Sequence, residues 1–307
     1  MDELVKKDLE KQGYRVVGDH SAIKVCSWSK KSLRDEGFCY KEKFYGLKSH
    51  RCVQSSVSVL NCHHQCVFCW RSLEHTQPME INKGDTPEEI LKGLIEAHKL
   101  YLMGFRGNDA VDKKKFEEAL DPKHVALSLS GDATLYPQLP ELVELIKKKG
   151  MTAFLVTNGQ NPEMLKKVNA TQTYVTLPAP NKEVYLKTCK PFFKDGWERL
   201  IRSLEVLSSK DRSTVRLSVL KGLNLCDVEG YASIIKKCNP MFVEVKAVMA
   251  VGYASYRVEY SDMARHEEIE QFSLKLGEIL GWRLVAEKTE SRVCLLMKED
   301  KDRKLCY

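Results

Sequence analysis

Three cysteines lie within eight residues of one another, at positions Cys62, Cys66 and Cys69. Thiolates spaced by four and three residues can converge on one metal centre from a single loop. An iron–sulfur cube has four iron corners, so three protein thiolates leave one iron open to an external ligand. A zinc site completed by His63 or His64 is the alternative, but zinc modules usually bring two separated ligand pairs. The spacing therefore favours a redox-active iron–sulfur cluster.

A second set of cysteines precedes the first. Cys26, Cys39 and Cys52 are spaced by thirteen and thirteen residues, a pattern that matches no compact zinc module. Their segment is polar and offers little core in which to bury them. A folded-back loop that holds a second cluster, again with an open iron, is one interpretation. Three unrelated buried cysteines and a zinc ion with His20 or His50 as its fourth ligand are the others.

Two lysines, Lys41 and Lys43, follow Cys39 closely and flank Glu42. A lysine beside a metal and another cation has its ammonium form disfavoured. Its neutral amine can then form a Schiff base with a ketone. The ordinary alternative is a pair of solvated lysines on either side of a glutamate, and the residues alone leave both open.

Composition limits the class of protein. The 307 residues are 43% hydrophobic, which suffices for one large core or two modest domains. No run of about eighteen apolar residues predicts a membrane span. The charged start, Met1–Lys11, lacks an apolar signal region, so we expect a cytoplasmic protein. Eleven cysteines, an odd number without a secretion signal, argue against a disulfide framework.

The formal net charge is +7, and eight of the basic side chains lie between Lys24 and Arg51. Such a local excess can bind phosphates, or it can be a solvated surface. Aromatic side chains in the same segment can stack on unpaired bases or pack in a small core. They are Trp28, Phe38, Tyr40, Phe44 and Tyr45.

Strand and helix signals alternate after an irregular, polar first fifty residues. Thr86, Pro87 and Glu89 mark the start of the first long helix. Residues 104–121 look like an insertion, and the segments 282–287 and 293–297 predict a final hairpin. Repeated strand–helix units predict a parallel sheet, closed or open, with covering helices and a site at the carboxyl ends of the strands. The predicted strands are Val53–Leu60, Val125–Ser130, Thr152–Thr157, Tyr174–Leu177, Val215–Leu220 and Phe242–Met249.

The spacing of the first three cysteines resembles the radical S-adenosyl-L-methionine (SAM) superfamily. The resemblance implies an α/β fold, a partial or complete parallel (β/α) barrel. It also implies that SAM chelates the open iron and is cleaved to methionine and a 5′-deoxyadenosyl radical. An acidic residue after the second strand accepts from the SAM amino group in that family, although relatives mostly carry Gly-Glu-Pro where this chain has Gly-Asp-Ala. The residues that match the SAM-contacting motifs are Gly131, Asp132, Thr134, Asn158 and Ser218.

Both cysteine sets together resemble the 4-demethylwyosine synthases, over essentially the whole chain and in the short archaeal form. The runs Ser-Gly-Asp-Ala-Thr-Leu-Tyr-Pro, Thr-Asn-Gly-Gln and Val-Glu-Val-Lys-Ala-Val-Met-Ala-Val-Gly-Tyr support this resemblance. It implies one domain over residues 1–307: an N-terminal extension (1–52) that binds the second cluster, a barrel core (53–250), and a C-terminal helix and hairpin (251–307).

The same resemblance implies a carbon–carbon lyase with two [4Fe-4S] clusters and SAM. Its substrates are pyruvate and N1-methylguanosine beside the anticodon of tRNA, and its product is a tricyclic base. The second cluster chelates pyruvate while Lys41 or Lys43 forms the Schiff base. An external electron donor, a monomeric state and no membrane association are further expectations.

Two other functions stay open at this point. One is a radical SAM enzyme whose auxiliary cluster serves another substrate, and the other is a zinc- and RNA-binding protein without catalysis. Iron and sulfide content separates the second from the enzymes. Glu244 and Lys246 alternate inward on the last predicted strand of the barrel, either for function or as part of a buried structural ion pair.

Overall fold

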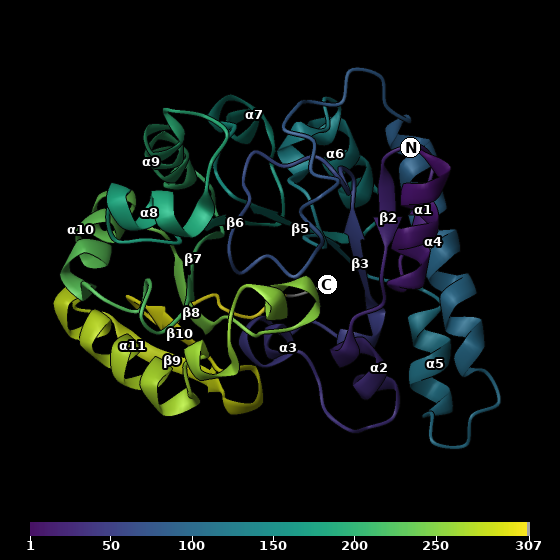
Figure 1. Ribbon diagram of the computed structural model, residues 1–307. Helices are drawn as coiled ribbons and strands as arrows, with labels where there is room; N and C mark the ends of the chain where they lie inside the picture. Colours follow the sequence, from purple (N-terminus) through teal and green to yellow (C-terminus); the bar gives the residue numbers. More distant parts are fainter. Residues whose placement is uncertain (306–307) are drawn as a thin grey trace.

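One ten-stranded sheet runs through the protein in the order β1-β2-β3-β4-β5-β6-β7-β8-β10-β9 (Figure 1). The computed structural model describes residues 1–305. The six central strands run parallel to one another. They are β3 (Cys52–Ser56), β4 (His124–Leu127), β5 (Thr152–Thr157), β6 (Gln172–Thr176), β7 (Ser213–Val219) and β8 (Phe242–Ala247). The two ends of the strand order do not pair, so the predicted barrel is a partial one.

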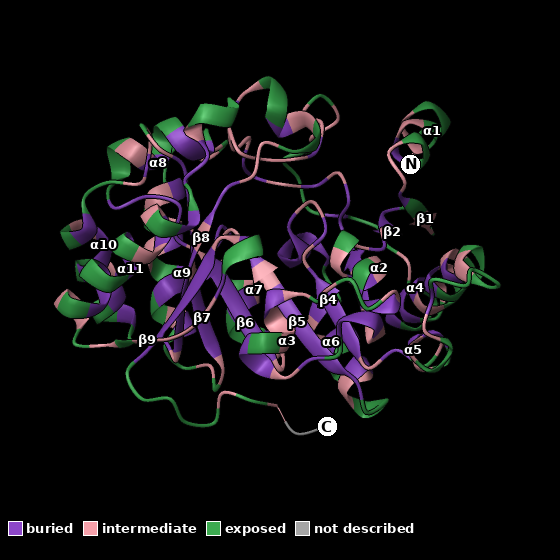
Figure 2. Cartoon of the chain, turned by 90° about the horizontal axis from the view of Figure 1, so that it is seen from below, coloured by how far each residue is buried: buried purple, intermediate pink, exposed green. Residues whose placement is uncertain are grey.

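Helices cover the outer face of this curved sheet, and Figure 2 shows the buried strands inside a ring of helices with exposed outer sides. The main core fills the layer between them and includes Leu155 of β5 and Val245 of β8. Thr86 and Glu89 form the predicted capping box at the first long helix. The helices that follow the N-terminal segment are α4 (Pro87–Leu102), α5 (Lys113–Ala119), α6 (Leu139–Lys148), α7 (Pro162–Lys167), α8 (Lys182–Cys189), α9 (Gly196–Leu207), α10 (Val228–Cys238) and α11 (His266–Leu280).

Antiparallel strands extend the sheet at both edges. The short strands β1 (Arg15–Val17) and β2 (Ser21–Ile23) pair with each other, and β2 pairs with β3. At the other edge β9 (Arg283–Lys288) and β10 (Val293–Met297) form the predicted hairpin, and β10 pairs with β8. The sheet is therefore continuous through all three predicted parts of the chain, although the division at residues 52 and 250 stays a prediction.

The prediction of an irregular N-terminal segment is wrong. Besides β1 and β2 it contains α1 (Glu3–Lys11), α2 (Ser27–Leu33), α3 (Tyr40–Tyr45) and the 3-10 turn η1 (Ser49–Arg51). These elements are too short for a hydrophobic period to identify, and tertiary packing stabilises them. The buried side chains of α3 pack on the inner face of the sheet with Phe154, Tyr174 and Phe242. Base stacking is therefore excluded for three of the five aromatic side chains proposed for it, namely Tyr40, Phe44 and Tyr45, because all are buried.

Several predicted boundaries differ for one physical reason. Strands β3, β4 and β8 end two to four residues before the predicted ends, because their carboxyl-terminal residues turn away into the loops of the site. The predicted insertion at 104–121 contains the short helix α5, and α8 is a helix that the sequence did not predict. No helix among residues 1–305 combines the length and apolar content that crossing a membrane requires.

Candidate functional site

The loop with Cys62, Cys66 and Cys69 follows β3 at the carboxyl edge of the sheet. Backbone hydrogen bonds hold it to distant segments: Cys62 N donates to Gln77 O at 3.0 Å, and Val67 N donates to Thr188 O, at the end of α8, at 2.9 Å. The guanidinium of Arg257, which follows β8, donates to the carbonyl oxygens of Val67 (3.2 Å) and Cys69. Three parts of the chain thus fix the shape of this loop.

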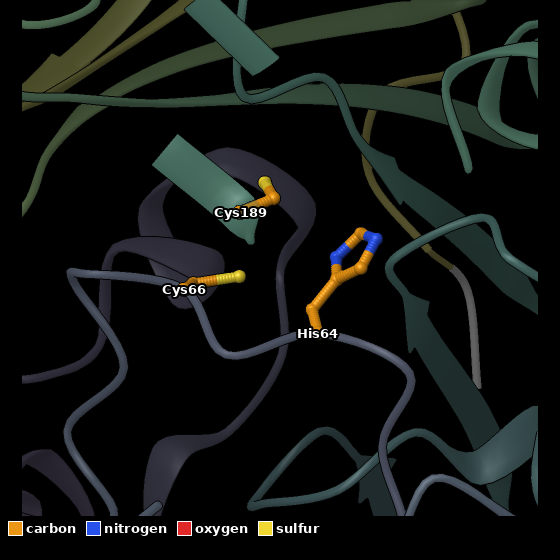
Figure 3. Close-up of side chains that lie close together, drawn as sticks. All are labelled: His64, Cys66 and Cys189. Carbon is orange, nitrogen blue, oxygen red and sulfur yellow. The ribbon is translucent and has the colours of Figure 1, made fainter. Parts of the chain in front are cut away.

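Two residues of the loop, His64 and Cys66, lie beside the buried Cys189 of α8 (Figure 3). Their ligand atoms all lie within 4.8 Å of one another. A hydrogen bond with Cys189 and burial raise the pKa of the Cys66 thiol well above its ordinary value. The Nε2 atom of His64 is 2.8 Å from the hydroxyl of Tyr185. Cys189, which the sequence motifs did not identify, is thus in contact with the first cysteine set.

The spread of Cys62, Cys66 and Cys69 indicates whether these thiols suit a cluster or a single ion. Among residues 1–305, the ligand groups compact enough for one ion are His64–Cys66–Cys189 and His266–Glu287–Cys294. Neither contains Cys62 or Cys69, so the three thiols of the loop are spread more widely than one zinc ion requires. An iron–sulfur cube is larger than a single ion and suits such a spread. The donor set therefore fits the cluster.

The side-chain amide of Asn158 and the guanidinium of Arg71 lie near the thiol of Cys62. Asn158 Nδ2 donates to its sulfur at 3.5 Å. Burial raises the pKa of the Cys62 thiol to about 12, and the nearby Arg71 guanidinium acts in the opposite direction. Arg71 is itself buried, and its Nη2 has no hydrogen-bond partner among the described residues. The guanidinium of Arg71 is therefore available to stabilise the negative charge of a cluster bound by these thiols.

The turn after β4 contacts the start of the loop through the backbone of Asp132, whose N donates to Asn61 O at 2.8 Å, and the Asp132 carboxylate joins this turn to the turn after β5. This buried carboxylate accepts from the Thr134 backbone and hydroxyl (2.9 and 2.6 Å), the Thr157 hydroxyl (2.8 Å) and the Asn158 backbone (2.8 Å). Its four donors come from the two turns predicted to contact SAM. The structure therefore gives Asp132 an organising task, and a direct contact with the SAM amino group stays a prediction. Ser218 lies on the inner face of β7 and is half-buried.

Gly131 adopts a φ of +67°, and a Cβ atom there would lie 1.7 Å from the carbonyl oxygen of Ser58. Both the backbone conformation and the space require glycine. We expect Gly131→Ala to push the cysteine loop away from the turn, to destabilise the fold by more than about 2 kcal/mol, and to remove most of the bound iron. Thermal unfolding and iron analysis measure the two effects.

Gly150→Ala is the matched control, because Gly150 has a φ of +68° and a Cβ atom added there would meet no other atom within 4 Å. This variant measures the loss of stability caused by alanine at a positive φ without a clash. The additional loss in Gly131→Ala is then due to the clash with Ser58. Equal destabilisation by the two variants, with iron retained in Gly131→Ala, would show that the close approach to Ser58 is unimportant.

The structure brings the second cysteine set together. Cys26 is the N-cap residue of α2, Cys39 is the N-cap residue of α3, and Cys52 is the first residue of β3. Burial raises the pKa of Cys39 to about 11 and that of Cys52 to about 12, and the neighbouring Cys26 thiol adds to both shifts. The Lys41 cation acts in the opposite direction on both. Three thiols from separate elements therefore share one electrostatic environment.

The two histidines proposed as fourth zinc ligands already have partners. His20 Nδ1 is 2.7 Å from the Val57 carbonyl oxygen, and its Nε2 accepts from Asp85 N at 3.0 Å. His50 Nε2 is 2.8 Å from a carboxylate oxygen of Glu118. Neither histidine is therefore free to complete a zinc site with the second set.

Lys41 lies on the inner face of the sheet, whereas Lys43 is exposed. The Nζ atom of Lys41 is 4.9 Å from the ring centroid of Phe154 and 4.7 Å from that of Tyr174. Burial lowers the pKa of Lys41, and the Arg216 cation lowers it further. A lysine with this environment has more neutral amine at a given pH than an exposed one.

A buried carboxylate holds the helix of Lys41 in place. Glu244 of β8 is fully buried and accepts from Tyr45 (2.7 Å) and Tyr40 (3.1 Å) of α3, and from Arg216 of β7 (3.0 Å). Glu244 therefore pairs with Arg216 and not with Lys246. Sequence reasoning missed Arg216, although its alternation between Val215 and Leu217 indicated an inward polar position.

Lys246, the other inward residue of β8, donates to the carbonyl oxygen of Ser291 at 2.8 Å. Burial and the Arg216 cation lower its pKa to about 8. The inner face of the sheet thus holds two lysines of lowered pKa near the second cysteine set. Burying charged side chains costs free energy of folding, so such a polar interior indicates a reactive site.

Known families match this chain over most of its length. The radical SAM superfamily matches residues 57–235, and the family described as wyosine base formation matches residues 237–298. The chain is 45% identical to the S-adenosyl-L-methionine-dependent tRNA 4-demethylwyosine synthase of Pyrococcus abyssi, over 98% of this chain and 91% of that one. It is 40% identical to the synthase of Mus musculus, named TYW1, over 97% of this chain and 42% of that one.

A solved structure of TYW1 with a lysine–pyruvate adduct bound has a TM-score of 0.90 and 36% identity, and the match covers 99% of this chain and 98% of that one. The fold and the family inferred from the cysteine spacing are thereby confirmed. The chain belongs to the radical SAM superfamily and, within it, to the SAM-dependent tRNA 4-demethylwyosine synthases.

Proposed function

We propose that this enzyme condenses N1-methylguanosine in tRNA with pyruvate to form the tricyclic 4-demethylwyosine base, as a carbon–carbon lyase. The observation that carries the detailed proposal is the position of Lys41, partly buried on the inner face of the sheet and electrostatically coupled to the second cysteine set. Family membership excludes the zinc-binding protein without catalysis, and the alternative of another radical SAM substrate has no specific support.

Cys62, Cys66 and Cys69 hold the first [4Fe-4S] cluster in this proposal. When bound and reduced, this cluster would supply the electron for cleavage of SAM, which yields methionine and the radical that would take hydrogen from the N1-methyl group. Asn158 donates a hydrogen bond to the Cys62 sulfur, and hydrogen bonds to sulfur tune the reduction potential of such clusters. Gly131, Asp132, Thr134 and Ser218 complete the proposed SAM contacts.

Lys41 is the residue that we assign to pyruvate. Its neutral amine attacks the ketone carbon, water leaves, and an imine links the two. The lowered pKa favours the neutral amine, and the lysine–pyruvate adduct in the solved TYW1 structure supports the assignment. The adjacent thiols of Cys26, Cys39 and Cys52 would hold a second [4Fe-4S] cluster, which would supply a metal site for binding pyruvate.

The remaining parts of the proposal rest on the sequence alone. They are a monomeric state, a cytoplasmic location and an external electron donor. The basic segment 24–51 is proposed to contact tRNA phosphates, although Arg34, Lys48 and Arg51 each pair with a carboxylate of the chain. The basic side chains left for phosphates are therefore fewer than the sequence count implies.

The test is a reconstituted reaction under anaerobic conditions. Enzyme loaded with iron and sulfide is incubated with SAM, a chemical reductant, isotope-labelled pyruvate and tRNA that carries N1-methylguanosine, and digested nucleosides are weighed by mass spectrometry. We expect the tricyclic nucleoside with two labelled carbons. Samples without pyruvate, or with tRNA lacking the N1-methyl group, are the controls. SAM cleavage without any new nucleoside in the complete mixture would contradict the proposed substrates.

A further inference from the structure

Two tyrosines after β8 are among the most exposed large side chains of the described residues. Tyr256 is 81% exposed and Tyr260 is 79% exposed. They lie in the segment 252–262, which consists of the 3-10 turns η4 (Gly252–Tyr256) and η5 (Tyr260–Asp262). Figure 1 shows this segment crossing the open front of the molecule. Rings at such exposure contribute nothing to the core, and two of them in one short segment are typical of a binding surface.

The opposite side of the same segment is fixed to the first cysteine loop. Val258 is buried and packs with Val67 and Phe68 of that loop. Tyr253 N donates to Trp70 O at 2.9 Å, and Arg257 donates to the carbonyl oxygens of the loop. The segment that bears the two tyrosines is therefore held against the first cysteine loop.

The position of the segment also links it to the RNA substrate. It lies within residues 237–298, which match the wyosine family, and outside residues 57–235, which match the radical SAM superfamily at large. Tyrosine rings stack on bases of any sequence. Enzymes that recognise RNA loops use such rings on bases that are splayed out of their stack.

We propose that Tyr256 and Tyr260 form a stacking platform for unpaired bases of the anticodon loop, which brings the methylated guanosine to the first cysteine loop. This inference rests on the proposed function. Because the base of the platform is already ordered, little conformational freedom is lost when RNA binds. Stacking involves no net charge, so this part of the affinity is independent of the counterions that phosphate contacts release.

The test compares the affinity of four proteins for tRNA that carries N1-methylguanosine, by filter binding over a range of salt. They are the wild type, Tyr256→Ala/Tyr260→Ala, Tyr256→Phe/Tyr260→Phe and Leu274→Ala. We expect the double alanine variant to bind on the order of 100-fold more weakly, about tenfold for each ring lost. The double phenylalanine variant should bind like the wild type, because it keeps both rings. Leu274, 54% exposed on α11, is the control for loss of an exposed apolar side chain elsewhere.

The salt dependence separates stacking from phosphate binding. The double alanine variant should keep the wild-type slope of log Kd against log salt concentration, while charge reversal at Lys30 and Lys31 should flatten it. Iron content and thermal unfolding show whether the double alanine variant is folded. If it is misfolded, the tRNA affinity of the single variants Tyr256→Ala and Tyr260→Ala is measured instead.

Three results would overturn the proposal. Wild-type affinity in the double alanine variant would show that the tyrosines do not contact tRNA. Unchanged tRNA affinity with slower reduction by a protein electron donor would assign the surface to that donor. A wild-type protein that does not bind tRNA at all would overturn the proposed function as well, so the two failures are distinguishable.

Discussion

Alanine in place of Cys62, Cys66 or Cys69 is expected to abolish SAM cleavage. Each thiol is one of three protein ligands to the cluster, and the described residues offer no fourth thiol on the loop as a substitute. Cys189 lies close to Cys66 but on α8, behind the loop. A cluster that lacks one thiolate is lost or displaced. Each variant is purified anaerobically, and 5′-deoxyadenosine is measured by chromatography after addition of SAM and reductant.

Cys226→Ala is the control for the loss of a thiol as such. Cys226 is exposed, and its thiol donates only to the Leu223 carbonyl oxygen. This variant should cleave SAM at the wild-type rate. Near-normal 5′-deoxyadenosine from any one of the three loop variants would be incompatible with a cluster held by all three thiols.

Borohydride is expected to trap pyruvate on this enzyme as a covalent adduct, and Lys41→Ala should remove the adduct completely. Lys43→Ala is the matched control, because Lys43 lies two residues away in the same helix but is exposed. The adduct is located by mass spectrometry of peptides. A trapped peptide that persists in Lys41→Ala and disappears in Lys43→Ala would reverse the assignment.

The pH dependence of trapping gives a second measurement. A lysine amine attacks a ketone only in its neutral form, and burial together with Arg216 lowers the pKa of Lys41. Lowering this pKa increases the neutral fraction at every pH below the ordinary value. The yield of adduct should therefore stay high at pH values where an exposed lysine is almost entirely protonated. A profile centred on the ordinary lysine pKa would contradict this account.

Cys39→Ala separates the two cysteine sets. It should lose the iron of the second set, retain SAM cleavage, and make no tricyclic nucleoside. Full yield of the tricyclic nucleoside from this variant would show that Cys26, Cys39 and Cys52 are structural.

The central strands were predictable because their apolar runs are continuous. Strand β5 has the predicted bounds, Thr152–Thr157, since both of its faces are buried and turns flank it. The helix α3 was not predictable, because six residues carry too little periodicity and its stability comes from contacts with Glu244 and the inner face of the sheet. Local pattern thus identified the elements whose own residues form a continuous apolar run.

The same distinction applies to the site. The first cysteine set was predictable because its ligands are neighbours in the chain. The choice between Lys41 and Lys43 was not, because it depends on the distant rings of Phe154 and Tyr174. The partner of Glu244 depends on the register of β7 and β8, which places Arg216 directly opposite it. Sequence spacing contains no information on that register.

The backbone hydrogen bonds of the first cysteine loop affect how its cluster is assembled. In small zinc domains the ligands are ordered only when the metal binds, so metal and fold are gained and lost together. Here Gln77, Thr188 and Arg257 order the loop through contacts that involve no thiol. The conformational entropy of the three cysteines is therefore lost when the chain folds and not when the cluster binds. A molecule whose cluster has been destroyed by oxygen therefore keeps a preorganised receptor, and resupply with iron and sulfide can restore it without refolding the chain.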